Sequence, residues 1–197
     1  IISSLQTAIS FMATKIRQLS VAADPTGPED ALSKRINLPE VRRIAAWAAE
    51  GVENLERLWR LAGSDNRLTG VNALWVMTHL PRSESAWLDS HQGELIDMLL
   101  IESDVARKRM LLQLLKGRKY HPDTMRTDFL DYCLLKINSE CEAYSVRAFC
   151  IHVAFKMCRH YPELLAELEE HLSMLALQHL PPGLTSARRN VLAAMKK

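Results

Sequence analysis

The sequence predicts an all-α fold in which about four to five helix pairs stack into a right-handed superhelix. Composition is the first observation behind this prediction: aromatic residues make up only 6% of the 197 residues, while leucine and alanine are abundant, and this favours helices over strands. Periodicity is the second, because apolar residues recur at helical spacing and no segment alternates like a strand bounded by hairpin turns. The third is the set of prolines and glycines that interrupt the helical pattern at short intervals.

The chain divides into two predicted regions at residue 38. Residues 1–38 hold an amphipathic pattern over 3–20, which predicts an N-terminal helix, and then a loop over 24–30 with two prolines and a glycine. Residues 39–197 form the predicted repeat domain, a series of helices with short breaks. These helices are expected at residues 39–49, 51–62, 66–80, 85–100, 103–117, 122–137, 141–160, 162–179 and 184–196. The 141–160 helix is apolar nearly all round, so we expect it in the middle of the array.

Composition also excludes several classes of protein. Hydrophobic residues make up 48% of the chain and charged residues 24%, which is ordinary for a globular protein and argues against a disordered, collagen-like or low-complexity chain. The formal net charge of +2 does not by itself indicate a polyanionic partner.

A similar segment recurs at the start of every second helix of the repeat domain. Each copy has a small or β-branched residue, then an arginine (an asparagine in the second copy), and then an apolar stripe. The copies begin at Val41, Val71, Ala106, Val146 and Ala187, which are 30 to 41 residues apart. Two helices per period of this length are typical of an α-solenoid.

The clearest copy is Val146-Arg147-Ala148. On these segments, residues 39–197 resemble the HEAT-repeat family, whose second helices often begin with Val-Arg followed by Ala. We call the first helix of each pair the A helix and the second the B helix. The resemblance implies that the B helices line the concave face of the array.

Charge is distributed unequally between the two kinds of helix. The A helices have a net negative charge, most clearly over 85–100 and 162–179, and the B helices a net positive one, most clearly over 102–119 and 183–197. With the B helices on the concave face, this predicts a basic groove, and such a groove would concentrate an acidic partner.

Seven basic residues on the B helices are the candidate partner-binding residues: Lys108, Arg109, Lys116, His152, Lys156, Arg159 and Arg189. The alternative for this stripe is a solvated face with no specific ligand. Arginines at the second position of the recurring segment have a different alternative, namely ladders to acids or carbonyl groups between repeats; these are Arg42, Arg107, Arg147 and Arg188. We expect charge reversal of Lys108, Arg109, Lys156 and Arg189 to leave the fold nearly as stable.

The predicted function is a non-catalytic scaffold that binds a protein or an acidic peptide. The alternative is nucleic-acid binding, because the chain also resembles the DNA alkylation repair glycosylases, which are short, basic-faced HEAT-like solenoids. That resemblance implies aromatic residues and an acidic residue on the concave side. Trp47 and Trp75 lie on B helices, but Gly51 and His79 stand one turn further on, where a carboxylate would be needed. We therefore expect no catalytic residue and no cofactor.

A purely structural subunit is the third possibility. Its dimer contact would use Trp59, Trp87 or the N-terminal helix, and an exposed apolar patch would mark it.

Four cysteines, Cys133, Cys141, Cys150 and Cys158, are spaced by eight or nine residues, unlike the short gaps of a zinc knuckle. We interpret them as reduced, small hydrophobic residues inside helices, with a metal site or disulfides as the alternative. No metal site is expected. The sequence has no run of about 18 apolar residues and no secretory signal pattern, so we expect no membrane partner and a cytoplasmic location.

Overall fold

The computed structural model describes residues 27–196, and within that range the chain is helical and contains no strand. This confirms the predicted all-α class. The long helices are α3 (Leu38–Ala48), α4 (Val52–Ala62), α5 (Arg67–Met77), α7 (Gln92–Ile101), α8 (Val105–Lys116), α9 (Thr127–Ile137), α10 (Tyr144–Cys158), α11 (Pro162–Leu175) and α12 (Pro182–Met195). Shorter elements are α2 (Pro28–Leu32), α6 (Ser85–Ser90) and the 3-10 turns η1 (Arg82–Glu84) and η2 (Pro122–Thr124).

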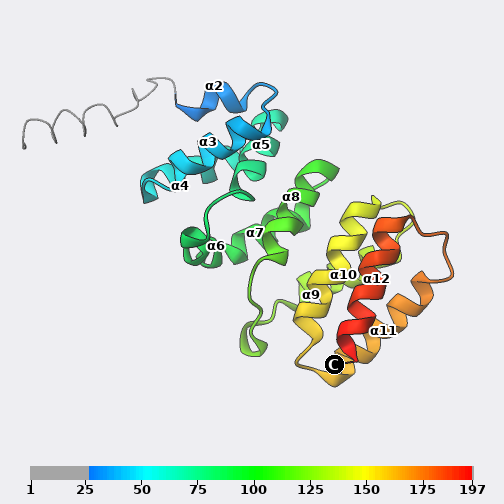
Figure 1. Ribbon diagram of the computed structural model, residues 1–197. Coiled ribbons are helices and arrows are strands. Elements are labelled where there is room, and N and C mark those ends of the chain that lie inside the picture. Colours follow the sequence, from blue (N-terminus) through cyan, green and yellow to red (C-terminus); the bar gives the residue numbers. More distant parts are fainter. Residues whose placement is uncertain (1–26, 197) are drawn as a thin grey trace, which may run out of the picture.

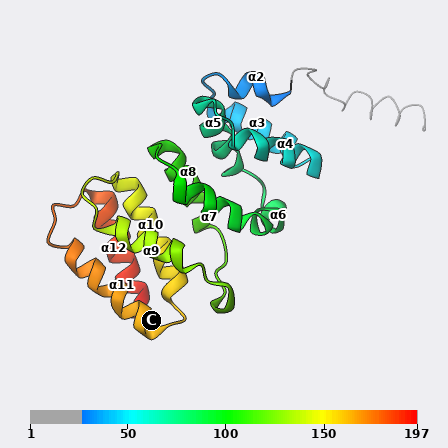
Figure 2. The same ribbon diagram turned by 180° about the vertical axis from the view of Figure 1, so that it is seen from behind.

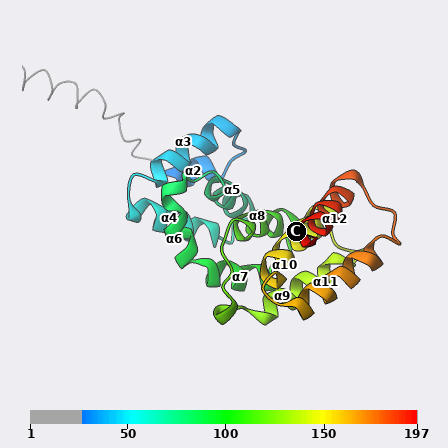
Figure 3. The same cartoon turned by 60° about the horizontal axis from the view of Figure 1, so that its bottom comes forward.

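The long helices form two layers. In the inner layer, α3, α5, α8, α10 and α12 pack each against the next, and α4, α7, α9 and α11 cover them from the outer side. Figure 3 shows the array as a curve with the inner helices along its hollow side. The two ends of the array, α2 and the α11–α12 pair, lie far apart in both Figure 1 and Figure 2. The inner layer therefore corresponds to the predicted B helices, as an α-solenoid requires.

α10 lies inside the array, with helices packed against it before and after. α10 contacts α8, α9, α11 and α12, and eight of its residues, from Val146 to Cys158, are buried. A helix with neighbours on most sides needs apolar residues on most sides. The nearly all-round apolar pattern of 141–160 therefore predicted its place correctly.

α2 packs at the start of the array, within the predicted N-terminal region. Leu32 at its end is fully buried in the common core, and α2 packs against α5. Residues 28–30, predicted as loop, begin this helix. The amphipathic helix predicted over residues 3–20 lies outside the described residues.

Most predicted helices of the repeat domain are present, but the one predicted over 85–100 is broken at His91 into α6 and α7. The Oγ of Ser90 donates to the carbonyl of Trp87 at 2.7 Å, and His91 Nδ1 lies 2.8 Å from the same oxygen. Side-chain contacts of this kind compete with the helical hydrogen bonds of the main chain. The break also sets the His91 ring against its neighbours, with centroids 4.2 Å from Trp87 and 5.0 Å from Trp59.

Two further helices begin later than predicted. The 122–137 helix is divided into η2 and α9, because the chain is extended at Met125 and Arg126 between them. The 141–160 helix begins only at Tyr144, after a turn in which Glu142 faces the interior. Cys141 therefore lies exposed in a turn and not inside a helix.

Side chains at the second position of the recurring segment bind the carbonyl ends of outer helices. Arg107 donates to the last residue of α4 at 3.0 Å, Arg147 to the last residue of α9 at 2.9 Å, and Arg188 to the last turn of α11 at 2.6 Å. Asn72 donates to the last residue of α2 at 2.8 Å. Cations and amides placed here satisfy carbonyl groups that a helix end leaves open. Arg107 reaches the preceding pair as predicted, whereas Arg147 and Arg188 bind the outer helix of their own pair. Arg42 is exposed and makes no such contact within residues 27–196.

Trp59 and Trp87 pack together on the outer side. Their ring centroids are 6.1 Å apart in an edge-to-face arrangement, and Trp87 Nε1 donates to Glu56 Oε1 at 3.0 Å. Both rings are half-buried. The two tryptophans proposed as a dimer contact therefore join α4 to α6 within the chain.

Candidate functional site

Lys108, on the inner helix α8, is turned into the protein. Only 9% of the residue is exposed, and its Nζ donates to Glu142 Oε2 at 2.9 Å. Lys136 Nζ lies 3.3 Å from the same oxygen. This ion cluster joins α8, α9 and the turn before α10. It corrects the expectation that Lys108 faces the groove, and it predicts that reversal of this charge lowers stability.

The same cluster makes stability depend on pH. Burial opposes the ionisation of Glu142, but hydrogen bonds from Lys108 and Lys136 outweigh burial and hold the pKa of this carboxyl below its ordinary value of 4.5. Ionised Glu142 therefore stabilises the fold fully above that value, and the contribution is lost as the pH falls through the lowered pKa. We expect the free energy of unfolding to fall between about pH 5 and pH 3, and to fall less in Glu142→Gln. Urea unfolding at several pH values measures both slopes; identical slopes would contradict this role.

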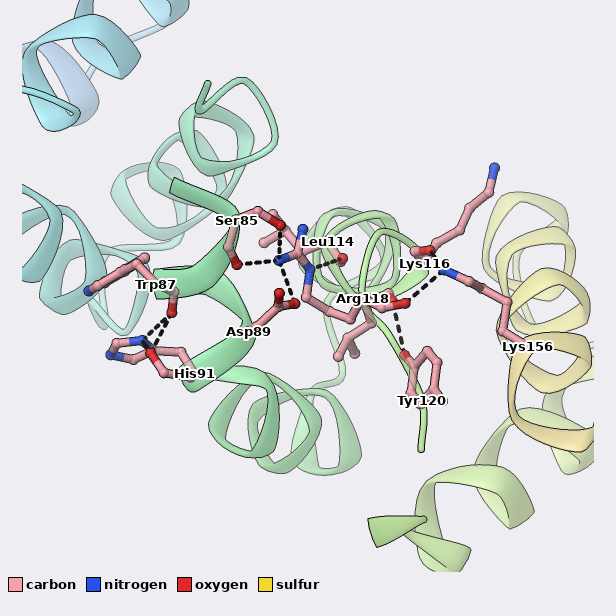
Figure 4. Close-up of polar contacts among 11 residues, drawn as sticks. Ser85, Trp87, Asp89, His91, Leu114, Lys116, Arg118, Tyr120 and Lys156 are labelled. Carbon is pink, nitrogen blue, oxygen red and sulfur yellow. Dashed lines mark hydrogen bonds and ion pairs between the residues drawn. The ribbon is translucent and has the colours of Figure 1, made fainter. Parts of the chain in front are cut away.

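Lys156, on α10, binds the end of α8. Its Nζ donates to the carbonyl oxygens of Lys116 and Arg118, each at 2.7 Å (Figure 4). Burial lowers the pKa of Lys156, and the charges of Arg159, Arg118 and Lys116 lower it further. A lysine that satisfies two carbonyl groups at a helix end has a structural task, which is a second correction to the predicted set of partner-binding cations.

Arg118 links the same end of α8 to α6, and we call these contacts of Lys156 and Arg118 the joint. The Nη1 of Arg118 donates to the carbonyl of Ser85 and to Asp89 Oδ1, both at 2.9 Å. α6, α8 and α10 are thereby tied together at the carboxyl end of α8. In Figure 4 the side chain of Lys116 points away from the joint, so its ammonium group is not used there.

Lys116 and His152 meet in a groove between α10 and α12. The groove has a volume of about 510 Å³, which is within the range of ligand pockets. Its walls include Lys116 of α8, Phe149 and His152 of α10, and Leu184 and Asn190 of α12. No residue of the outer helices lines it, so the groove opens on the inner layer.

The groove combines an apolar floor with positive charge. Lys116 Nζ lies 5.7 Å from the centroid of the Phe149 ring, close enough for an attraction between the cation and the ring. Burial lowers the pKa of His152, and the charge of Lys116 lowers it further, so His152 is neutral at pH 7. No carboxylate stands among the described residues that line the groove. An anionic group next to Lys116 would therefore meet no like charge there.

The three other predicted cations are exposed and lie outside this groove. Arg159 lines a separate hollow of about 350 Å³ together with His160, Met195 of α12 and four residues of the outer helix α11, among them Glu169. Arg109 and Arg189 are exposed, and neither forms a hydrogen bond or ion pair within residues 27–196. The seven predicted residues therefore do not form one continuous site. Lys108 and Lys156 make contacts within the protein, Lys116 and His152 line the groove, and the three arginines lie elsewhere.

Tyr144, Phe149 and Asn190 were missed as candidate site residues. Tyr144 is 55% exposed at the start of α10, and all three line the groove. The nearly all-round apolar pattern of 141–160 held a signal for Tyr144 and Phe149, because it includes more apolar faces than neighbouring helices cover, whereas nothing in the pattern marked Asn190 on α12. Only the positions of α8 and α12 show which face remains open.

Trp47 and Trp75 are the tryptophans of the inner layer, where a glycosylase-like site would need an acidic partner. The ring of Trp75 packs edge-on against His79 with centroids 6.2 Å apart. In residues 27–196 neither Trp47 nor Trp75 donates its indole N–H to a carboxylate; the tryptophan that does so is Trp87, on the outer side.

The cysteines are unpaired thiols within the described residues, three of them buried. Burial raises the pKa of Cys133, and burial together with the charge of Glu167 raises the pKa of Cys158 to about 12. Protonated, buried thiols are poor nucleophiles and poor metal ligands. The described residues contain no group of three or more histidine, cysteine and acidic side chains placed to hold a metal ion, and none of their helices combines the length and apolar character needed to cross a bilayer.

Comparison with known proteins agrees with this architecture. A family model described as a HEAT repeat domain matches residues 28–195, which is nearly the whole of the described chain. No curated protein and no solved structure matches the sequence. The paired helices, the two layers and the recurring arginine position are thus those of a helical-repeat scaffold, and the chain belongs to the HEAT repeat domain family.

Proposed function

We propose that this chain is a non-catalytic scaffold whose inner helix layer binds an acidic segment of a protein partner. The observation that carries the proposal is the α10–α12 groove, which places Lys116 beside an apolar floor and has no carboxylate in its lining. A stretch of partner chain with carboxylates would be attracted to this layer and would meet little repulsion.

Four exposed cations of the inner helices supply the long-range attraction: Arg109, Lys116, Arg159 and Arg189. Exposed charge pairs contribute little individually, about 0.2–1 kcal/mol each. Together they would change affinity by roughly tenfold or more.

The test is fluorescence anisotropy with a fluorescein-labelled polyglutamate of about 20 residues, measured over a salt series. Reversal of the four inner-layer cations to glutamate is expected to weaken binding at least about tenfold. The matched control reverses four exposed cations outside the inner layer, Arg35, Arg60, Arg82 and Lys119, and changes the net charge by the same amount. It is expected to weaken binding by less than about threefold.

Equal weakening by the two quadruple variants would show a response to net charge alone and would overturn the proposal. The proposal would also be overturned if the protein bound single- or double-stranded DNA tightly and in a salt-dependent manner but did not bind polyglutamate. That result would favour a nucleic-acid partner.

A further inference from the structure

We infer that the α10–α12 groove recognises a short extended peptide segment in which an apolar side chain, aromatic or branched, directly adjoins an acidic residue. This inference rests on the proposed function and adds the identity of the recognised segment. It follows from the length of the groove, from its floor and from the position of its one lysine.

The length of the groove limits the occupant to a few residues. Lining residues run from Tyr144 to His152 on α10 and from Gly183 to Asn190 on α12. Each stretch is about 10–12 Å long along its helix axis. An extended chain rises about 3.3 Å per residue, so about three residues of a partner fit along the groove.

The floor selects an apolar side chain. Ala148 and Phe149 contribute the accessible apolar surface, since Leu184 and Ala187 are buried, and Phe149 is only half-buried although it packs against the core. At about 510 Å³ the groove is large enough to accept an aromatic side chain. An apolar side chain placed on Phe149 would remove the exposed part of this floor from water.

Lys116 selects the residue of the peptide that adjoins the apolar side chain. Its ammonium group lies 5.7 Å from the centroid of the Phe149 ring, whereas the other cation of that helix end, Arg118, is buried in the joint with α6. A carboxylate bound by Lys116 would thus sit within one residue of the side chain on Phe149. The hydroxyl and amide groups of Ser145, Ser186 and Asn190, which also line the groove, can hydrogen-bond the main chain of an extended peptide.

The first test compares two labelled pentapeptides with the unmodified protein. One has a central phenylalanine flanked by two aspartates on each side, and the other has alanine at the centre. We expect the phenylalanine peptide to bind at least about tenfold more tightly and to shift the backbone NMR signals of Ser145, Ala148 and Ala187. Equal affinity of the two peptides, or shifts confined to other helices, would overturn the inference.

Two single variants test separately what the apolar floor and the charge of Lys116 contribute to peptide binding. Ser186→Trp fills the groove without changing the charge, and we expect it to abolish the preference for phenylalanine while polyglutamate still binds. Lys116→Glu is expected to weaken both pentapeptides by about fivefold or more. Lys119→Glu, an equal charge change three residues away on an exposed side chain outside the groove, is expected to change affinity less than twofold.

The outcomes also distinguish this inference from the proposed function. Polyglutamate that binds through the inner-layer cations, combined with no preference for phenylalanine, would overturn the groove inference and leave the proposed function standing. Failure of every acidic probe would overturn both. If oligothymidylate shifts the groove signals and the pentapeptides do not, the groove is a base-stacking site on Phe149 and Tyr144, and the peptide inference is wrong.

Discussion

Replacing Lys108 with glutamate is expected to lower the free energy of unfolding by about 3–5 kcal/mol. Lys108 is 9% exposed and donates to Glu142, which is itself buried. The substitution removes the partner of a buried carboxylate and places a second carboxylate next to it. Lys136, at 3.3 Å, is the one cation of this described cluster left to balance the two. Urea unfolding followed by circular dichroism at pH 7 measures the loss.

Arg109 provides the matched control for this experiment. It is the next residue on the same helix, it is exposed, and it forms no ion pair within the described stretch of the chain. Arg109→Glu makes the same change of charge and is expected to alter the free energy of unfolding by less than about 0.5 kcal/mol. Similar losses in the two variants would show that helix α8 tolerates neither change and that the ion cluster is not the cause.

Replacing Arg147 with alanine is expected to cost about 3 kcal/mol or more. Only 2% of Arg147 is exposed. Its Nε donates to the carbonyl of Ile137 at 2.9 Å, and its Nη2 donates to the side chain of Gln178. Truncation leaves the buried carbonyl of Ile137 and the half-buried side-chain oxygen of Gln178 without this donor. It also leaves a cavity between α9, α10 and the chain that follows α11. A drop in the melting temperature and in the urea midpoint is the expected result.

Arg42 is the control that the repeat itself supplies. It stands at the same position of the recurring segment in α3, but its side chain is exposed and makes no contact with a helix end in the described residues. Arg42→Ala is expected to change the free energy of unfolding by less than about 0.5 kcal/mol. Equal losses at the two positions would mean that the arginine acts through its own helix alone and not through the carbonyl groups that it binds.

The helix predicted over 85–100 shows where pattern reasoning failed. Its apolar residues keep helical spacing across the whole segment, so periodicity gives no reason for a break. At the break, Ser90 and His91 contact the carbonyl of Trp87, and the ring of His91 also packs against Trp87 and against Trp59, which lies on another helix. Such a long-range contact leaves no mark in the local spacing.

The candidate site was predicted incompletely for a similar reason. Residue type and spacing placed a row of cations on the inner helices, and Lys116 and His152 do line the groove. Spacing alone cannot distinguish them from Lys108 and Lys156, which belong to the same two helices. The difference is made by a partner far away in the sequence: Glu142 for Lys108, and the end of α8 for Lys156.

The sequence by itself determined the all-α class, the pairing of helices and the place of α10 between neighbouring helices. These features follow from apolar periodicity, from proline and glycine breaks and from a repeated segment, all of which are local properties of the chain. Only the tertiary structure decided which cations are buried, which apolar face stays open and where the groove lies. Those properties depend on how α8, α10 and α12 are placed beside one another, because burial and charge pairing are set by neighbours in space and not by neighbours in sequence.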